Sequence, residues 1–441
     1  MRLVAGLLVA LCITGATTSF QTVRPPAPHP GLYDANPTHL WNRIHEHFHV
    51  RVAPDGTAYG FDTVDPLLWY ETRYLLNGPS HARAIQLLDE FLTTGGERLV
   101  TDPLKRAVFQ HDLWAIFDWL ASSWESRGIP EKAARTALMQ RVARVIRRVA
   151  LTKSQIEALP DTYAAAVASG TFVDRGDHSP QGLLLPRDLF DASGPWIAVG
   201  GTQPVTPQHA GELGRSAFIV LWSAPRGSAD TAAYLRKLWD FPQPYVLDDS
   251  FQLPRDGELR VKPNPALPAV PDGTRIALVR KMMLIDNTGA IVPSAVVQSI
   301  QLRAFLAAWP RHQFSELRMS RADLFAGRAG GLRMIGPDEE EFITFSSKGM
   351  DVFERHESKY GPGPVRPGPV LTGCVNCHHV DFEPGIQTVL SLRQILKPIT
   401  LVDSHHDRWA RYFPQTFAAA DAKRRTYEWG VLAGLWQTQP R

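Results

Sequence analysis

The chain has 441 residues, of which 44% are hydrophobic and 21% are charged. This balance excludes an intrinsically disordered chain and is sufficient for one large hydrophobic core or for two to three smaller cores. The formal net charge is only +3, and no long basic run occurs. We therefore expect no nucleic-acid partner.

The N-terminus has the pattern of a secretory signal. Arg2 precedes an apolar run that ends at Ile13, and small residues follow. The run is too short to span a bilayer. A lipoprotein anchor on Cys12 is disfavoured because Leu11 occupies a position that needs a small residue. We expect residues 1–20 to be removed, leaving a periplasmic or otherwise extracytoplasmic product without a transmembrane span.

A Pro-rich tether over residues 21–34 leads to a region with helical patterning over residues 35–170. Capping residues followed by proline mark several helix starts, and glycines mark the ends. The expected starts are Asn36-Pro37, Asp65-Pro66, Ser80, Asp102-Pro103, Pro130 and the capping box Thr152–Gln155. The expected ends are Asn77-Gly78, Gly95-Gly96 and Gly128.

The first of these helices carries His45-Glu46-His47-Phe48-His49, which contains a His-Glu-x-x-His pattern. On a helix, His45 and His49 share a face and could bind zinc, with Glu46 as general base. Turn residues after Val50 predict that the helix ends at His49, whereas metalloproteases carry the pattern inside a long helix. Glu71 is the nearest third ligand. We interpret the histidines as favourable charges at a helix C-terminus.

Residues 171–315 form a mixed α/β region, because glycine and proline become frequent and helical periodicity ends. Short apolar runs predict strands, and Asp286–Gly289 predicts the turn of a hairpin. The expected strands are Trp196–Val199, Ala217–Trp222, Arg275–Ile285 and Ile291–Leu302, with a helix at Ser228–Leu238. The hairpin predicts an antiparallel sheet with one face on the helices, and the fold class is α+β, predominantly α.

Three segments complete the expected organisation. Residues 316–360 are a connecting helical region, with one helix near Asp338–Phe353. Residues 361–370 are a Pro/Gly strap, either a linker or an extended segment. Residues 371–441 contain the strongest chemical signature of the chain.

That signature is Cys374-Val375-Asn376-Cys377-His378, a Cys-x-x-Cys-His sequence. It resembles the haem-attachment motif of c-type cytochromes. The resemblance covers these five residues and implies one covalent haem c, with Cys374 and Cys377 as thioether anchors and His378 as the proximal iron ligand. With Cys12 in the signal, the mature chain has no other cysteine.

Two other interpretations of the cysteine pair were weighed. A zinc site would need two further ligands, for which His379, His405 and His406 are available. A redox dithiol would need a βαβ context, but glycine and proline flank the motif. Haem is therefore favoured, a zinc site is second, and a chance occurrence of the motif is last, because the mature chain has no other cysteine.

Several residues are candidates for the distal iron ligand. Small cytochromes c carry a helix before the motif and a methionine ligand after it, but here no methionine follows Met350. His405 and His406 are the preferred candidates, because neighbouring aspartates could orient an imidazole. Both could equally be surface residues. Upstream candidates are Met319, Met334 and Met350, whereas His379 is too close to His378 to reach the opposite face of the iron.

The C-terminal tail is rich in aromatic residues, which could line a haem pocket or pack a terminal helix. They are Trp409, Tyr412, Phe413, Tyr427, Trp429 and Trp436. Packing is the favoured interpretation for most of them.

Three functions follow from these observations. The first is an exported monohaem c-type cytochrome-like protein that transfers single electrons to an unidentified redox partner protein. The second is a haem enzyme or sensor, peroxidase-like, with an open distal site. The third is a zinc-binding structural or binding protein without haem.

Overall fold

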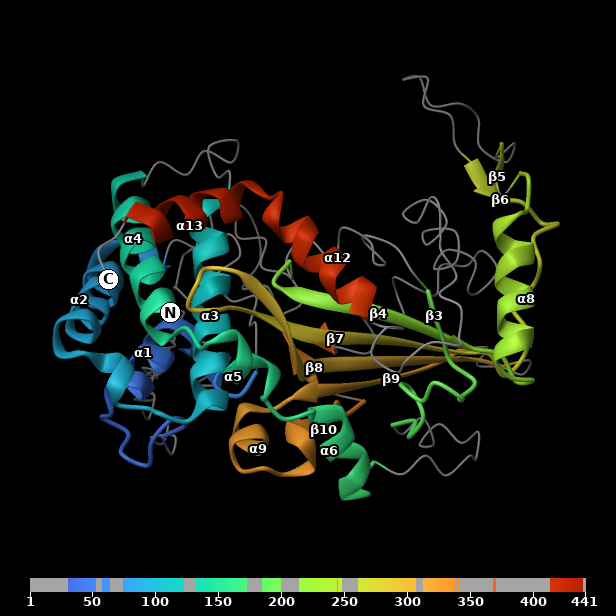
Figure 1. The fold of residues 1–441 in the computed structure, drawn as a ribbon, viewed down its shortest axis with the longest axis horizontal. Coiled ribbons are helices and arrows are strands. Elements are labelled where there is room, and N and C mark those ends of the chain that lie inside the picture. Colours follow the sequence, from blue (N-terminus) through green and yellow to red (C-terminus); the bar gives the residue numbers. More distant parts are fainter. Residues whose placement is uncertain are drawn as a thin grey trace, which may run out of the picture.

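The structure is a computed structural model, and the chain adopts an α+β fold in which more residues lie in helices than in strands. The described residues are 31–52, 58–63, 74–122, 132–172, 185–199, 214–243, 245–247, 261–306, 312–337, 339–341, 368–369 and 413–438. A layer of helices packs against one end of an antiparallel sheet (Figure 1).

The N-terminal helices carry the local signals that their sequence predicts. They are α1 (Leu40–His49), α2 (Gly78–Thr94), α3 (Pro103–Ala121), α4 (Lys132–Val149), α5 (Lys153–Glu157) and α6 (Thr162–Ser169), with 3-10 turns at Tyr74–Leu76 and Gly96–Arg98. Asp102 caps α3 by accepting a hydrogen bond from the Lys105 amide at 2.9 Å. Both halves of the Thr152–Gln155 capping box are present at α5. Gly95 ends α2 at φ 71°.

Some helix boundaries differ from the prediction. The first helix begins at Leu40 because the Asn36 side chain accepts from the amide of Thr38 at 3.0 Å and forms a turn before the helix. Helix α2 begins at Gly78 instead of Ser80, and α3 ends at Ala121, before Gly128. The helix expected from Asp65 lies largely outside the described residues.

Six strands form one antiparallel sheet in the order β10-β9-β8-β7-β4-β3. They are β3 (Ile197–Val199), β4 (Ser216–Ser223), β7 (Arg275–Ile285), β8 (Ile291–Phe305), β9 (His312–Met319) and β10 (Leu332–Met334). The predicted hairpin between β7 and β8 is confirmed. Asp286 Oδ1 accepts from the amides of Thr288 and Ala290, both at 2.9 Å, and Gly289 supplies the φ of 88° that the turn requires.

Short pairs and single helices complete the described part. The pairs are β1 (Arg51–Val52) with β2 (Ala58–Tyr59), β5 (Tyr245–Leu247) with β6 (Val261–Pro263), and β11 (Glu340–Glu341) with β12 (Gly368–Pro369). The helices are α8 (Ser228–Trp239) and α9 (Arg321–Phe325), with a 3-10 turn at Ala329–Gly331. Glu340–Glu341 is a strand that pairs with the Pro/Gly strap, so the helix expected over Asp338–Phe353 does not begin there. The rest of that expected helix lies outside the described residues.

Alternation along the strands gives the sheet two apolar faces. Ile219 and Leu221 of β4 pack with Trp196, Val279 and Leu302 on one face. On the other face, the alternate β4 residues Phe218, Val220 and Trp222 pack against Tyr234 and Leu235 of α8.

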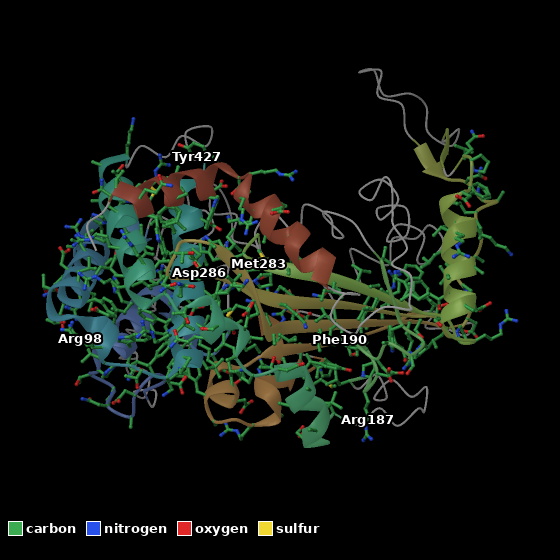
Figure 2. All side chains as sticks on the ribbon, viewed as in Figure 1. Arg98, Arg187, Phe190, Met283, Asp286 and Tyr427 are labelled. Carbon is green, nitrogen blue, oxygen red and sulfur yellow. The ribbon has the colours of Figure 1, made fainter. Side chains whose placement is uncertain are left out.

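The hairpin end of the sheet enters the helical layer. Met283, Ile285 and Ile291 belong to the core cluster that includes Trp114 of α3. Met283 and Asp286 lie where the strands meet the helices (Figure 2). The helical region and the sheet are therefore joined by shared core packing.

The two C-terminal helices cover this junction. Helix α12 (Phe413–Arg424) lies across β4 and β8, and α13 (Tyr427–Thr438) packs on α3 and α4 (Figure 1). Trp436 is buried in the helical core, and the Trp429 ring lies 5.8 Å from the Trp114 ring. These tail aromatics pack a terminal helix, as the favoured interpretation predicted, although Tyr427 is exposed. Among the described helices, none has both the length and the apolar character needed to cross a bilayer.

Candidate functional site

The residues of the proposed haem-attachment motif and its preferred distal candidates lie outside the described part of the chain, as does Met350, whereas Met319 and Met334 lie in β9 and β10. The motif residues and preferred candidates outside the described part are Cys374, Cys377, His378, His405 and His406. Glu71, the expected third ligand of the histidine pattern, and His379 also lie outside it. The structure describes both flanks of the motif segment and a separate buried cluster of possible metal ligands.

The N-terminal flank is held by the pairing of β12 with β11, in which Pro369 lies opposite Glu340. The neighbouring Glu339 forms a two-point ion pair with Arg333 of β10, with Nη1–Oε2 at 2.8 Å and Nη2–Oε1 at 2.6 Å. Hydrogen bonding from Arg333 holds the pKa of Glu339 below its usual value. The Pro/Gly strap is thereby connected to the edge of the main sheet.

The C-terminal flank is held by a buried charge cluster. Lys423 of α12 donates to Asp118 Oδ2 of α3 at 2.7 Å, and Arg215 Nη1 donates to the same oxygen at 3.1 Å. All three side chains are buried, and the ammonium of Lys423 lies 5.8 Å from the centre of the Trp114 ring. One carboxylate therefore connects α3, the start of β4 and α12.

A second buried cluster is formed by His45 and His49 of α1 and Asp112 of α3. Each residue contributes one ligand atom, and these three atoms lie within 4.8 Å of one another. The residues are exposed by 2%, 2% and 1%, respectively. Helical spacing brings the two imidazoles to one face of α1, and their rings are stacked with centroids 5.2 Å apart.

One nitrogen of His45 is oriented by the backbone. His45 Nε2 lies 2.8 Å from the Phe61 carbonyl oxygen, which can only accept, so Nε2 carries the proton in this arrangement. Nδ1 is buried and has no hydrogen-bond partner among the described residues. Burial and the nearby Arg321 cation lower the pKa of His45 well below its usual value, so the ring is neutral. A neutral imidazole whose second nitrogen is unprotonated is a metal-ligand form.

Asp112 is fixed by a fully buried arginine. Arg321 Nη2 donates to Asp112 Oδ1 at 2.8 Å, while Nη1 donates to the carbonyls of Phe61 and Thr63. Burial lowers the pKa of Arg321, but the interactions with Asp112, Tyr33 and Asp62 together raise it above its usual value, so the guanidinium stays charged. Tyr33 packs edge-on against His45 with ring centroids 5.7 Å apart. The hydrogen bond from Arg321 therefore holds the Asp112 carboxylate in place.

This geometry corrects the interpretation of the histidine pattern. Helix α1 does end at His49, as predicted, but His45 is neutral and buried, so it is not a charge placed to interact with the helix dipole. Glu46 is exposed, whereas the three residues of the cluster are buried, so the structure gives Glu46 no contact with the cluster that a general base would need. The third member is Asp112, which the sequence analysis missed. Its signal was the polar run Gln110–Asp112, which lies between the apolar residues Phe109 and Leu113.

Comparisons of the chain with known protein families, with curated proteins and with solved structures find no match.

Proposed function

We propose that the protein is an exported monohaem c-type cytochrome-like protein that transfers single electrons through one covalently bound haem c. The observation that carries the proposal is the sequence Cys374-Val375-Asn376-Cys377-His378. In this proposal Cys374 and Cys377 anchor the haem and His378 is the proximal iron ligand. The bound haem supplies an iron that accepts and releases one electron.

Use of the cysteines supports this proposal. Cys12 lies in the proposed secretion signal, and the mature chain then has cysteines only in the motif. Export would deliver the chain to the compartment where haem is attached to c-type cytochromes. A zinc site would need two more ligands for the same cysteine pair.

The contacts that fix the two segments flanking the motif suggest what the rest of the protein does in this proposal. Pro369 pairs with β11, and the chain from Pro369 to Cys374 spans at most about 18 Å when fully extended. On the other side, Lys423 fixes α12 to α3. We expect the body to hold the haem-carrying segment at both ends and to present it to a redox partner protein.

The test is expression of the full chain, with its leader, in a host that attaches haem, followed by a pyridine haemochrome spectrum and intact mass. The wild type should carry one haem per chain. Cys374→Ala with Cys377→Ala should carry none, and Asn376→Ser, which keeps the motif, should load like the wild type. A wild-type mass equal to the polypeptide alone would contradict the proposal.

The spin state separates electron transfer from haem enzymology. Two protein ligands give a low-spin iron in both oxidation states, whereas an open distal site gives a high-spin component and binds carbon monoxide or cyanide. We expect the low-spin form. If His405 or His406 is the distal ligand, its replacement by alanine converts the spectrum to high-spin, while the same change at the other histidine leaves it unchanged.

A further inference from the structure

We propose that His45, His49 and Asp112 form a binding site for one divalent transition-metal ion, distinct from the haem-attachment motif. The site lies between the C-terminal end of α1 and the middle of α3. The inference is independent of the proposed haem function, because none of its residues belongs to the motif segment.

The first argument is the buried nitrogen of His45. Its Nδ1 has no hydrogen-bond partner among the described residues, and the side chain is only 2% exposed. Leaving a buried polar atom unsatisfied costs about 1–3 kcal/mol. A metal ion at Nδ1 would satisfy this atom, and the donation from Nε2 to Phe61 already selects the required tautomer.

The second argument is convergence. The three ligand atoms lie within 4.8 Å of one another, although Asp112 is far from the histidines in the sequence. A tetrahedral zinc ion with bonds of about 2.1 Å places its ligands about 3.4 Å apart. Small side-chain rotations are enough to close this difference.

The third argument is the orientation of the carboxylate. Arg321 Nη2 donates to Oδ1 of Asp112 at 2.8 Å, which fixes the carboxylate beside the two histidines. A hydrogen-bonded carboxylate beside two imidazoles, one of them oriented by a carbonyl, has the arrangement of a metal-ligand shell with its supporting groups.

The ligand types select the class of ion. Two imidazoles and one carboxylate suit zinc, iron, nickel or copper. They do not suit calcium or magnesium, which prefer oxygen ligands. Because the Arg321 cation offsets the charge of Asp112, we expect weaker binding than at a site with an uncompensated carboxylate. The burial of all three residues indicates a structural ion that exchanges slowly.

The experiment uses the tag-free, haem-loaded protein. A chelator removes bound metal, the protein is desalted, and zinc chloride is titrated against a competing metal dye. The metal content is then measured by mass spectrometry. We expect about one zinc per chain, a higher unfolding temperature with zinc than without, and X-ray absorption that shows imidazole nitrogens at about 2.0–2.1 Å.

Two variants on the same helix locate the ion. His45→Phe keeps an aromatic ring and removes both ring nitrogens, so zinc affinity should fall at least about tenfold. His47→Phe is the matched control: His47 Nε2 also lies 2.8 Å from a backbone carbonyl, that of Ser80, but His47 is outside the cluster. It should bind zinc like the wild type.

A third variant separates this site from the cysteines. Cys374→Ala with Cys377→Ala should lose haem and keep the zinc. Zinc that is lost in this variant but kept in His45→Phe would overturn the inference. Should His45→Phe fail to fold, the wild type alone decides: an unfolding temperature that zinc does not raise, together with no retained zinc, would also overturn it.

Discussion

Replacing Asp118 by asparagine should be among the most destabilising single changes in the described part of the chain. The change keeps the side-chain volume and removes the charge that two buried cations share, Arg215 at 3.1 Å and Lys423 at 2.7 Å. At an effective dielectric constant of about 20, each contact contributes roughly 5–6 kcal/mol before desolvation is subtracted. Removing one member of a buried ionic cluster costs about 3–5 kcal/mol, a large share of a typical folding free energy of about 5–15 kcal/mol.

A second variant, at Lys423, tests the same charge cluster. Lys423→Met alone should cost only about 1 kcal/mol, because Asp118 keeps its contact with Arg215 and the methionine stem preserves packing. In the Asp118→Asn background the same change removes an unpaired buried ammonium. The double variant should therefore be more stable than Asp118→Asn alone.

The assay is urea unfolding of the purified full chain, followed by tryptophan fluorescence and far-ultraviolet circular dichroism, with coincident transitions as the check for two-state behaviour. Two results would refute the reasoning. One is a loss below about 1 kcal/mol for Asp118→Asn. The other is a double variant that is less stable than Asp118→Asn.

Two further predictions concern the β7–β8 turn and the edge of the sheet. Gly289→Ala should lower stability by about 1–2 kcal/mol, because φ is 88° there and a Cβ would meet Trp436 Nε1 at 3.0 Å. Gly434→Ala, which lies inside α13 with open space around it, should raise stability by up to about 1 kcal/mol. Thermal unfolding measures both variants. Equal shifts in the two variants would contradict this account of the turn. Arg333 lowers the pKa of Glu339 in the folded state. Their ion pair therefore stabilises the fold fully at pH values above the unfolded-state pKa of glutamate. This stabilisation is lost as the pH falls through the lower folded-state pKa. Because both side chains are partly exposed, the ion pair contributes less than about 1 kcal/mol. The difference in unfolding free energy between wild type and Glu339→Gln should shrink as the pH is lowered. A difference that grows on acidification would contradict this prediction.

The parts of the fold that could be predicted are those fixed by neighbours in the sequence. Asp102 caps α3 through a contact three residues away, and Asp286 organises its turn within four residues. Short apolar runs bounded by turn residues likewise located β4 and β7. These interactions need no knowledge of tertiary structure, so the sequence was sufficient to infer them.

The buried His-Asp cluster could not be predicted because it depends on how two helices meet. The spacing of His45 and His49 places them on one face of α1, but nothing in the local sequence shows that this face meets Asp112. Arg321 comes from a third, distant segment. A downstream acid such as Glu71 was the natural local expectation. A search for polar residues within the apolar pattern of α3 would have found Asp112.

The haem-attachment motif is different from both cases. Covalent attachment requires two thiols and an imidazole at a fixed spacing, so the signature is complete in Cys374–His378 and independent of the surrounding fold. The distal ligand depends on tertiary placement, and His405 and His406 therefore remain candidates.

The measurement that tests the central claim most directly is the intact mass of the mature protein after expression with the haem-attachment machinery. The account predicts the mass of the polypeptide plus one haem, and the loss of that increment when Cys374 and Cys377 are replaced by alanine. A mature chain that carries no covalent haem under these conditions would contradict the claim.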